Sequence, residues 1–352
     1  MAKELWAPLP FHPARPDLVV PARVDPKGLA GPTSAQARGR RCRTTSYGLY
    51  LPESVPTEQV EQRIVEAGVL LPAYGGVTGW AGLRWCGGRW FDGLGPDGAT
   101  ELPVSLAIAD STIRAQPGIE ISEERLDPRE VTEVDGLRVT VAVRSVCFLM
   151  RHARNERRAA EILDMAAYSD LVSIDEMRAY SATCNGWTGI PRCRKGTELA
   201  DENCWSPREA GMRQHWVLDA ELPRPLCNVP IFDRAGQHIG TPDLLDPVAG
   251  VIAEYDGAVH LAGARRALDV RREDAFRSHG LQVVTMTSAD LPDPSAFLGR
   301  LHRAYSRAAG LGEGRRSWTL EMPDWWVPTP TVAQRRALTE AQRARWLKYR
   351  GL

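Results

Sequence analysis

The chain has 352 residues, of which 43% are hydrophobic and 25% charged, as in an ordinary folded protein of two or three domains. Its 44 basic and 44 acidic residues cancel, which excludes a polycation that coats nucleic acid along its whole surface. No apolar run reaches the roughly 18 residues of a membrane span, and the first residues lack the apolar core of a signal peptide. Seven scattered cysteines without a Cys-x-x-Cys pair indicate reduced thiols and a cytoplasmic protein.

Residues 1–56 are expected to form a Pro-rich arm followed by a basic, winged-helix-like remnant. The pattern predicts a short basic helix over 33–43 and a turn with a strand over 44–52. Such a helix before a Gly-containing hairpin is typical of the last part of a winged helix that binds DNA, with Arg38, Arg40 and Arg41 as contacts. The alternative is a solvated basic surface beside an ordinary hairpin, since a GC-rich bacterial genome also enriches arginine.

Residues 57–203 are expected to form an α+β scaffold or recognition domain. Apolar residues at helical spacing predict helices over 58–71 and 78–85. Alternating segments over 102–113, 119–126 and 137–143 predict strands of an antiparallel sheet, and helices are expected from 145 onward. No part of this region has catalytic spacing.

Residues 204–312 are expected to form a further domain. Ser206 and Glu209 have the spacing of a capping box that opens a helix reaching about residue 219. Strands follow over 226–232, 238–245 and 251–256, then a helix over 262–279, a strand over 282–286 and a helix over 294–309. Residues 313–352 are predicted to be a Pro/Trp linker and a basic helix over 332–350. That helix either clamps a phosphate backbone or lies exposed in solvent.

Acidic residues occur on two neighbouring apolar strands, which a turn over 246–250 connects. Asp243 lies on the first strand, and Glu254 and Asp256 share one face of the second. Carboxylates among apolar strands are unfavourable unless a cation compensates them. Three converging oxygen ligands suit a hard divalent cation, Mg²⁺ or Mn²⁺.

The order α-β-β-β-α-β, with Glu209 on the first helix, Asp243 on a strand and Glu-x-Asp-Gly-x-x-His over 254–260, carries a family resemblance. It resembles the very-short-patch-repair-like endonuclease domains of the PD-(D/E)XK superfamily. The segments 48–52, 77–81 and 139–144 resemble an AbiEi-type antitoxin-like region, as in uncharacterised actinobacterial proteins. The resemblance implies an α+β multidomain chain whose C-terminal part, 204–312, has a restriction-endonuclease-like core.

The resemblance also implies metal-dependent hydrolysis of a DNA phosphodiester. Asp243 and Glu254 would be direct ligands, Glu209 would hold a metal-bound water or a second ion, and His260 would be the general acid or base. Asp256 stands where the superfamily has a lysine, so a positive charge would have to come from an arginine, such as Arg265 or Arg266.

Two other interpretations stay open. The first is a catalytically inactive DNA-binding regulator of antitoxin type, with a toxin as possible partner, and the second is a protein-interaction module. Each residue also has a purely structural interpretation: Glu209 as a helix cap, Asp243 and Asp256 as turn residues, and His260 as a solvated loop histidine.

Overall fold

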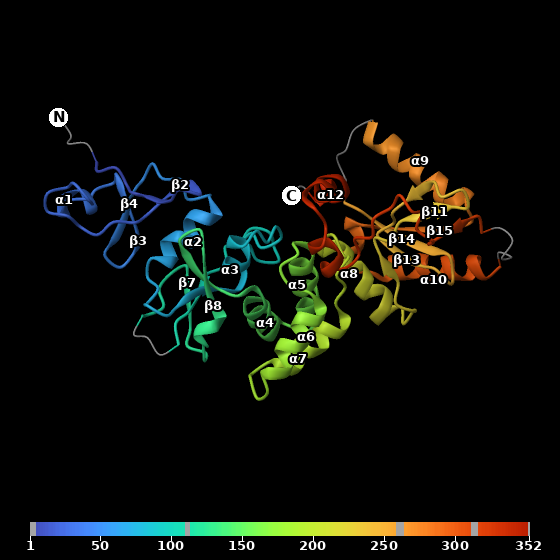
Figure 1. Ribbon diagram of the computed structural model, residues 1–352, viewed down its shortest axis with the longest axis horizontal. Coiled ribbons are helices and arrows are strands. Elements are labelled where there is room, and N and C mark those ends of the chain that lie inside the picture. The colour runs from blue at the N-terminus through green and yellow to red at the C-terminus, as the bar shows by residue number, and fades with distance from the viewer. Residues whose placement is uncertain (1–4, 110–112, 258–263, 311–315, 351–352) are drawn as a thin grey trace. The chain divides into compact units, whose positions relative to one another are not determined.

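The computed structural model describes residues 5–109, 113–257, 264–310 and 316–350 (Figure 1). The chain forms two compact units, residues 1–152 with 182–184 and residues 153–181 with 185–352. Each unit contains both helices and strands, which confirms the expected mixed α+β, multidomain class. No helix in the described ranges is long and apolar enough to cross a membrane.

The first unit is built on a five-stranded mixed sheet in the order β7-β6-β5-β9-β8. The expectation of an antiparallel sheet is wrong, because β5 pairs with β9 and β6 with β7 in parallel. The alternation of apolar and polar residues does not report strand direction, and the central strand β5 is only three residues long. The elements of this unit are β1 (Pro10–His12), β2 (Arg15–Val19), α1 (Ser34–Ala37), β3 (Cys42–Ser46), β4 (Leu49–Pro52), α2 (Val60–Gly68), β5 (Gly76–Thr78), α3 (Gly79–Trp85), β6 (Val104–Ala107), β7 (Ile119–Ser122), η1 (Pro128–Glu130), β8 (Val131–Val134), β9 (Leu137–Thr140) and α4 (Ala142–His152).

The basic helix expected over 33–43 is a single turn, α1. Thr33 and Gln36 close its N-terminus as a capping box, but Cys42–Ser46 pairs with β4 instead of continuing the helix. Arg38, Arg40 and Arg41 lie exposed on the turn between α1 and β3. One helical turn is too short to reach into a DNA groove as a recognition helix does.

The second unit joins a helical part to two small sheets. Its elements are α5 (Glu156–Tyr168), α6 (Ile174–Thr183), α7 (Ile190–Leu199), α8 (Pro207–Gln214), the π-helical turn η2 (His215–Asp219), β10 (Leu226–Cys227), β11 (Ile231–Asp233), β12 (His238–Gly240), β13 (Leu244–Asp246), β14 (Val251–Asp256), α9 (Ala264–Ser278), β15 (Gln282–Thr287), η3 (Ser288–Asp290), α10 (Ser295–Ala309), β16 (Trp318–Thr319), α11 (Val332–Arg336), α12 (Glu340–Trp346) and η5 (Lys348–Arg350). Strand β14 has the bounds that the sequence predicts.

The larger sheet of this unit has the order β10-β13-β14-β15. Neighbours are antiparallel except β14 and β15, which run parallel because α9 connects them as a crossover. Phe276 of α9 covers one face together with Ile252, while Phe297 and Leu301 of α10 cover the other face with Ala253. Figure 1 shows α9 and α10 on opposite sides of the strands.

The helices α5 and α7 belong to the same unit as this sheet, whereas the sequence analysis placed a domain boundary at 203/204. Within this unit a buried ion pair joins Arg213 on α8 to Asp164 on α5, with 2.7 Å between Nη2 and Oδ2. A buried ion pair of this kind holds both helices in one unit, because breaking it leaves an uncompensated charge.

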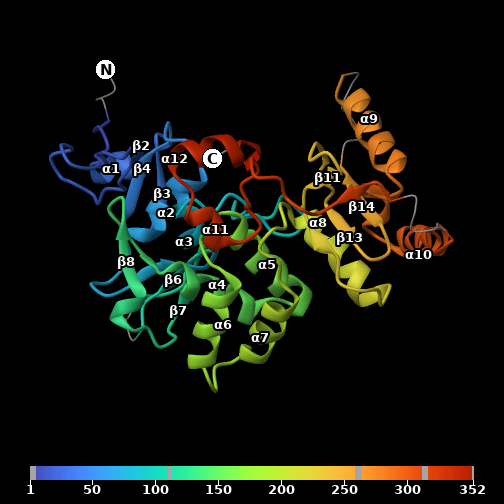
Figure 2. The ribbon, with the colours of Figure 1, turned by 45° about the vertical axis from the view of Figure 1, so that its right-hand side comes forward.

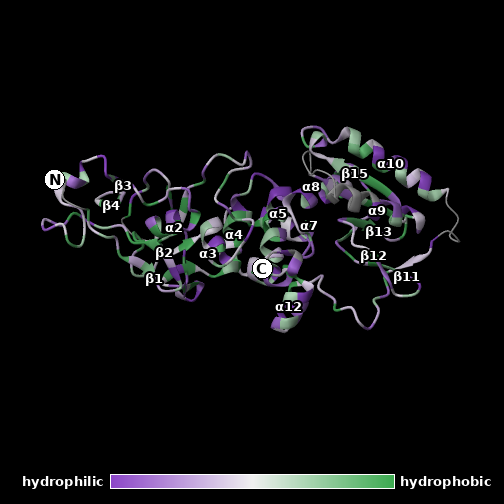
Figure 3. Cartoon of the chain, turned by 90° about the horizontal axis from the view of Figure 1, so that it is seen from above, coloured by the Kyte–Doolittle hydropathy of each residue, from purple (hydrophilic) through white to green (hydrophobic). Residues whose placement is uncertain are grey.

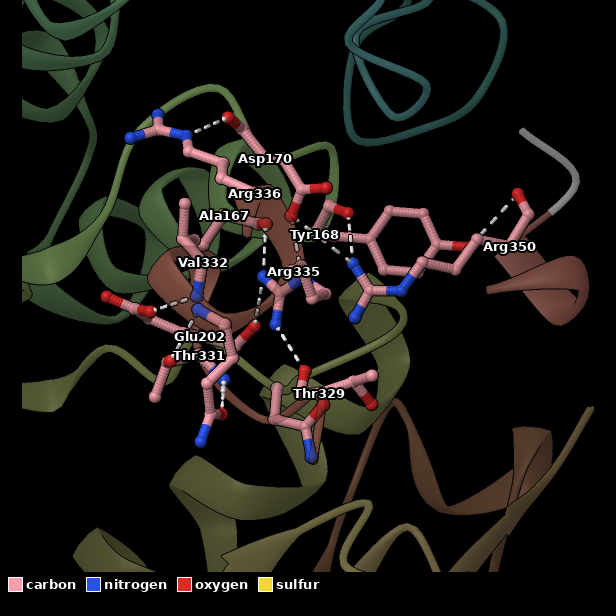
Figure 4. A network of polar contacts seen from close by, with 12 residues as sticks. Ala167, Tyr168, Asp170, Glu202, Thr329, Thr331, Val332, Arg335, Arg336 and Arg350 are labelled. Atoms are coloured by element: carbon pink, nitrogen blue, oxygen red, sulfur yellow. Dashed lines mark hydrogen bonds and ion pairs between the residues drawn. The ribbon is translucent and has the colours of Figure 1, made fainter. Parts of the chain in front are cut away.

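The C-terminal segment contains two short helices, α11 and α12, instead of one basic helix over 332–350. The segment is not wholly exposed, because Arg335 is fully buried and pairs with Asp170 at 2.6 Å between Nε and Oδ1 (Figure 4). Arg335 also donates to the carbonyl of Ala167 at the end of α5, and Figure 2 shows α11 beside α5. Arg350 is buried over the ring of Tyr168.

Candidate functional site

The hairpin of β13 and β14 positions the two central carboxylates. Its turn is closed by Asp246, whose Oδ1 accepts from the N–H groups of Val248 and Ala249, and by Gly250 at φ +71°. Leu244 pairs with Ala253, so continuing the register by one residue places Asp243 opposite Glu254. Side chains opposite one another in an antiparallel pair have Cβ atoms about 4.5–5.5 Å apart. Asp243 directly precedes β13, and the charge of Glu254 raises its pKa, so the two carboxyl groups lie close together.

Asp243 lies against the backbone of the neighbouring strand. Its Oδ2 accepts a hydrogen bond of 2.7 Å from the N–H of Tyr255. The residue as a whole is partly covered, and burial of its carboxyl group is the main cause of its raised pKa.

Glu254 is paired with an arginine that the sequence analysis did not assign to the site. Arg272, on α9, lies with Nη2 at 3.0 Å from Glu254 Oε1, and the Glu254 side chain is only 14% exposed. A positive charge was expected here from Arg265 or Arg266, and Arg272 is the arginine that the structure pairs with Glu254. Those two residues lie on α9, but their side chains fall outside the described part of the structure.

Glu209 occupies the first turn of α8 and is buried. Its Oε1 accepts from the Ser206 hydroxyl at 2.8 Å, and Ser206 Oγ accepts from the Glu209 N–H at 3.2 Å. The other oxygen, Oε2, accepts from the N–H of Trp205 at 2.9 Å and from Asn228 Nδ2 at 2.7 Å. Glu209 thus closes the N-terminus of its helix and at the same time turns toward the loop beside Asp243.

Asn228 links the two carboxylate-bearing segments. Its side chain holds Glu209, and its backbone N–H donates to the carbonyl of Asp243 at 3.0 Å. It has a φ of +48°, a left-handed conformation that Asn tolerates better than most residues. Its Oδ1 is buried and accepts no hydrogen bond from the described residues.

The electrostatics of the cluster show that these carboxylates interact. Burial raises the pKa of Asp243 well above its ordinary value, and the charges of Glu209 and Glu254 raise it further. The Tyr255 N–H and Arg272 oppose this rise. Burial also raises the pKa of Glu209, against the effect of Asn228, Trp205 N–H and Ser206. Both carboxyls therefore hold their protons to higher pH than they would in water, and a bound cation would favour their charged forms.

The remaining predicted site residues do not contribute to this cluster in the described part of the structure. Asp256 is exposed at the end of β14, and His260 lies outside the described residues. Arg38, Arg40 and Arg41 belong to the first unit.

The sequence contained signals for both residues that it did not assign. Arg272 precedes Phe276 by four positions, so the two share a helix face, and Phe276 packs on the sheet face that carries Ile252 and Glu254. Asn228 stands between two prolines in a loop, where Asn favours a left-handed turn.

The chemistry of the donor set fits a hard divalent cation, since it consists of carboxylate and amide oxygens alone. Asn228 Oδ1 is a further buried oxygen that is available beside Glu209. However, in the described residues no group of three His, Cys, Asp or Glu side chains is already arranged to hold a metal ion. Binding would require Glu254 to exchange Arg272 for the ion.

No family model, curated protein or solved structure matches this chain.

Proposed function

We propose that the chain is a Mg²⁺- or Mn²⁺-dependent DNA endonuclease of the very-short-patch-repair-like type, with a PD-(D/E)XK core in its second unit. The observation that carries the proposal is that Glu254 and Glu209 both lie near Asp243, at the start of the β13–β14 hairpin, and that their charges raise the pKa of Asp243. Such a buried acidic cluster is unfavourable in its charged form without a cation.

Each residue of the site has a separate role in the proposed reaction. Asp243 and Glu254 would hold the ion, which would neutralise charge developing on the phosphate and lower the pKa of the attacking water. Glu209 would accept a hydrogen bond from a water at that ion, and Asn228 fixes the orientation of Glu209. Arg272 neutralises Glu254 before the ion arrives and is then free to contact a phosphate oxygen.

A second candidate is a DNA-binding regulator of antitoxin type that keeps the nuclease-like core only as a scaffold. Two observations favour it: Arg272 already compensates Glu254, and Asp256 replaces the superfamily's lysine. A regulator of this kind binds DNA without a metal ion, and the first unit would then contact a toxin partner.

Nicking of supercoiled plasmid in Mg²⁺ or Mn²⁺ separates the two candidates. We expect Glu254→Gln to lower the nicking rate at least about 100-fold, since the loss of mere outer-shell partners of metal ligands already costs 10–100-fold. Glu321→Gln, at an exposed glutamate of the same unit, is the matched control and should retain the wild-type rate.

Nicking that is equal in wild type and Glu254→Gln would contradict the proposed site. DNA binding by a wild-type protein that nicks nothing in either metal would favour the regulator.

A further inference from the structure

A basic groove of about 410 Å³ lies along the open edge of β15, between α9 and α10. Its walls include Arg277 on α9 and three arginines on α10, Arg300, Arg303 and Arg307, which we call the α10 arginine row. Thr285 and Thr287 of β15 also line it.

The groove carries an excess of positive charge. Arg277 pairs with Glu273, and Arg300 pairs with Asp290. Arg307 donates from Nε to the neutral Gln282 side chain at 2.9 Å, and Arg303 contacts no carboxylate among the described residues. Four guanidinium groups thus face two carboxylates, which leaves 4 − 2 = 2 uncompensated charges.

The α10 arginine row differs from an ordinary solvated helix face. The helix α10 contains no Asp or Glu, and Figure 3 shows it with hydrophilic and hydrophobic residues in succession along its length. Its apolar side, with Phe297 and Leu301, is buried in the core. Positions 300, 303 and 307 are three and four residues apart, a spacing at which like charges repel one another and destabilise a helix. An anion bound in the groove would relieve this repulsion.

The groove adjoins the carboxylates of the candidate site. Thr285 pairs with Glu254 and Thr287 with Asp256 in the parallel register of β14 and β15. Neighbouring strands are about 4.8 Å apart, and paired residues project from the same side of a sheet. The α10 arginine row extends over about 10 Å of helix, at about 1.5 Å per residue. That length corresponds to the axial rise of about three nucleotides in one DNA strand.

We propose that this groove binds the phosphate backbone of the DNA strand that the neighbouring carboxylates act on, with Arg303 and Arg307 as the principal contacts. This inference rests on the proposed function for its substrate, but it concerns binding alone. Arginine suits the contact because its fork donates two hydrogen bonds to a phosphate.

Fluorescence anisotropy with a labelled 25-base-pair duplex tests the inference. The full chain is used in EDTA, with Glu254→Gln in every variant to prevent cleavage. We expect R303E/R307E to weaken binding at least about tenfold and to reduce the slope of log K against log salt by about two or more. R178E/R345E changes the same number of charges at exposed arginines of the same unit and should weaken binding less than about threefold.

Equal losses in the two double variants, or no loss in either, would overturn the inference, as would a wild-type groove that binds inorganic phosphate but not duplex DNA. Circular dichroism melting of each variant shows whether a loss reflects misfolding. If R303E/R307E loses its fold, the charge-removing pair R303Q/R307Q replaces it, with an expected slope reduction of about two.

The outcomes separate this inference from the proposed function. If DNA binding depends on the α10 arginine row but the protein never nicks DNA, the proposed groove is supported and the proposed endonuclease activity is contradicted. If R303E/R307E nicks DNA with an unchanged KM for DNA, the proposed endonuclease activity is supported and the proposed groove is contradicted.

Discussion

Asp243, directly before β13, lies close to Glu254 on β14 and to Glu209 on α8, and the charges of both glutamates raise its pKa. Such a placement keeps like charges close together in a partly buried site, where their repulsion is only weakly screened. Arg272 compensates part of this charge. The site therefore has the character of functional sites whose arrangement opposes folding stability.

The raised pKa of Asp243 predicts how stability changes with pH. The unfolded carboxyl titrates near its ordinary value of about 3.9, whereas the folded one retains its proton to higher pH. Between these two values the folded protein binds more protons, so its free energy of unfolding falls as the pH rises. We expect Asp243→Asn to lose less stability than wild type between pH 4 and pH 8 in metal-free buffer.

Urea unfolding at several pH values measures this difference. Asp256→Asn, at the exposed carboxylate of the same strand end, is the control and should follow the wild-type pH profile. Parallel profiles for wild type and Asp243→Asn would contradict the account of the site.

The residues of the site differ in how far the sequence predicts them. Asp243 and Glu254 are evident because acidic residues interrupt apolar strands. Arg272 and Asn228 are not, because their roles depend on tertiary contacts across 18 and 19 positions, between Arg272 and Glu254 and between Asn228 and Glu209. A local pattern identifies a charge that needs compensation, but it does not identify the partner that provides it.

At the scale of elements, the C-terminal segment shows how a basic sequence becomes part of a core. Arg335 lies among Asp170 and the carbonyls of Thr329, Pro330, Ala167 and Glu202, so its guanidinium is enclosed by acceptors (Figure 4). The two short helices were nevertheless visible in the sequence. Thr331 with Gln334 and Thr339 with Gln342 are capping boxes, and the second one marks a new helix start within the basic run.

We expect Arg335→Ala to lower the free energy of unfolding by about 3–5 kcal/mol, because it removes a fully buried guanidinium and leaves Asp170 with Arg343 alone at hydrogen-bond distance. Arg345→Ala removes an exposed arginine of the same segment and should change the free energy by no more than about 0.5 kcal/mol. Denaturant unfolding of both variants measures the difference. An equal loss of unfolding free energy in Arg335→Ala and Arg345→Ala would contradict a special role for the buried contacts of Arg335.

At the scale of the whole molecule, the sequence predicts the order of helices and strands better than the extent of the units. The strand β14 and the crossover helix α9 follow from local periodicity. The union of α5 and α7 with the sheet does not, because it depends on tertiary contacts such as the Asp164–Arg213 pair, whose partners are 49 residues apart. The parallel pairs in the first unit were missed for the same reason.

The most direct test of the account is calorimetric titration of the metal-free full chain with Mn²⁺ at neutral pH. We predict a saturable site that releases protons on binding, because the pKa values of Asp243 and Glu209 are raised and metal ligands must be deprotonated. We also predict that Asp243→Asn and Glu254→Gln each abolish or greatly weaken this site, while Asp256→Asn retains it. Equal Mn²⁺ binding by wild type and all three variants, or none by wild type, would contradict the claim that these carboxylates form a metal site.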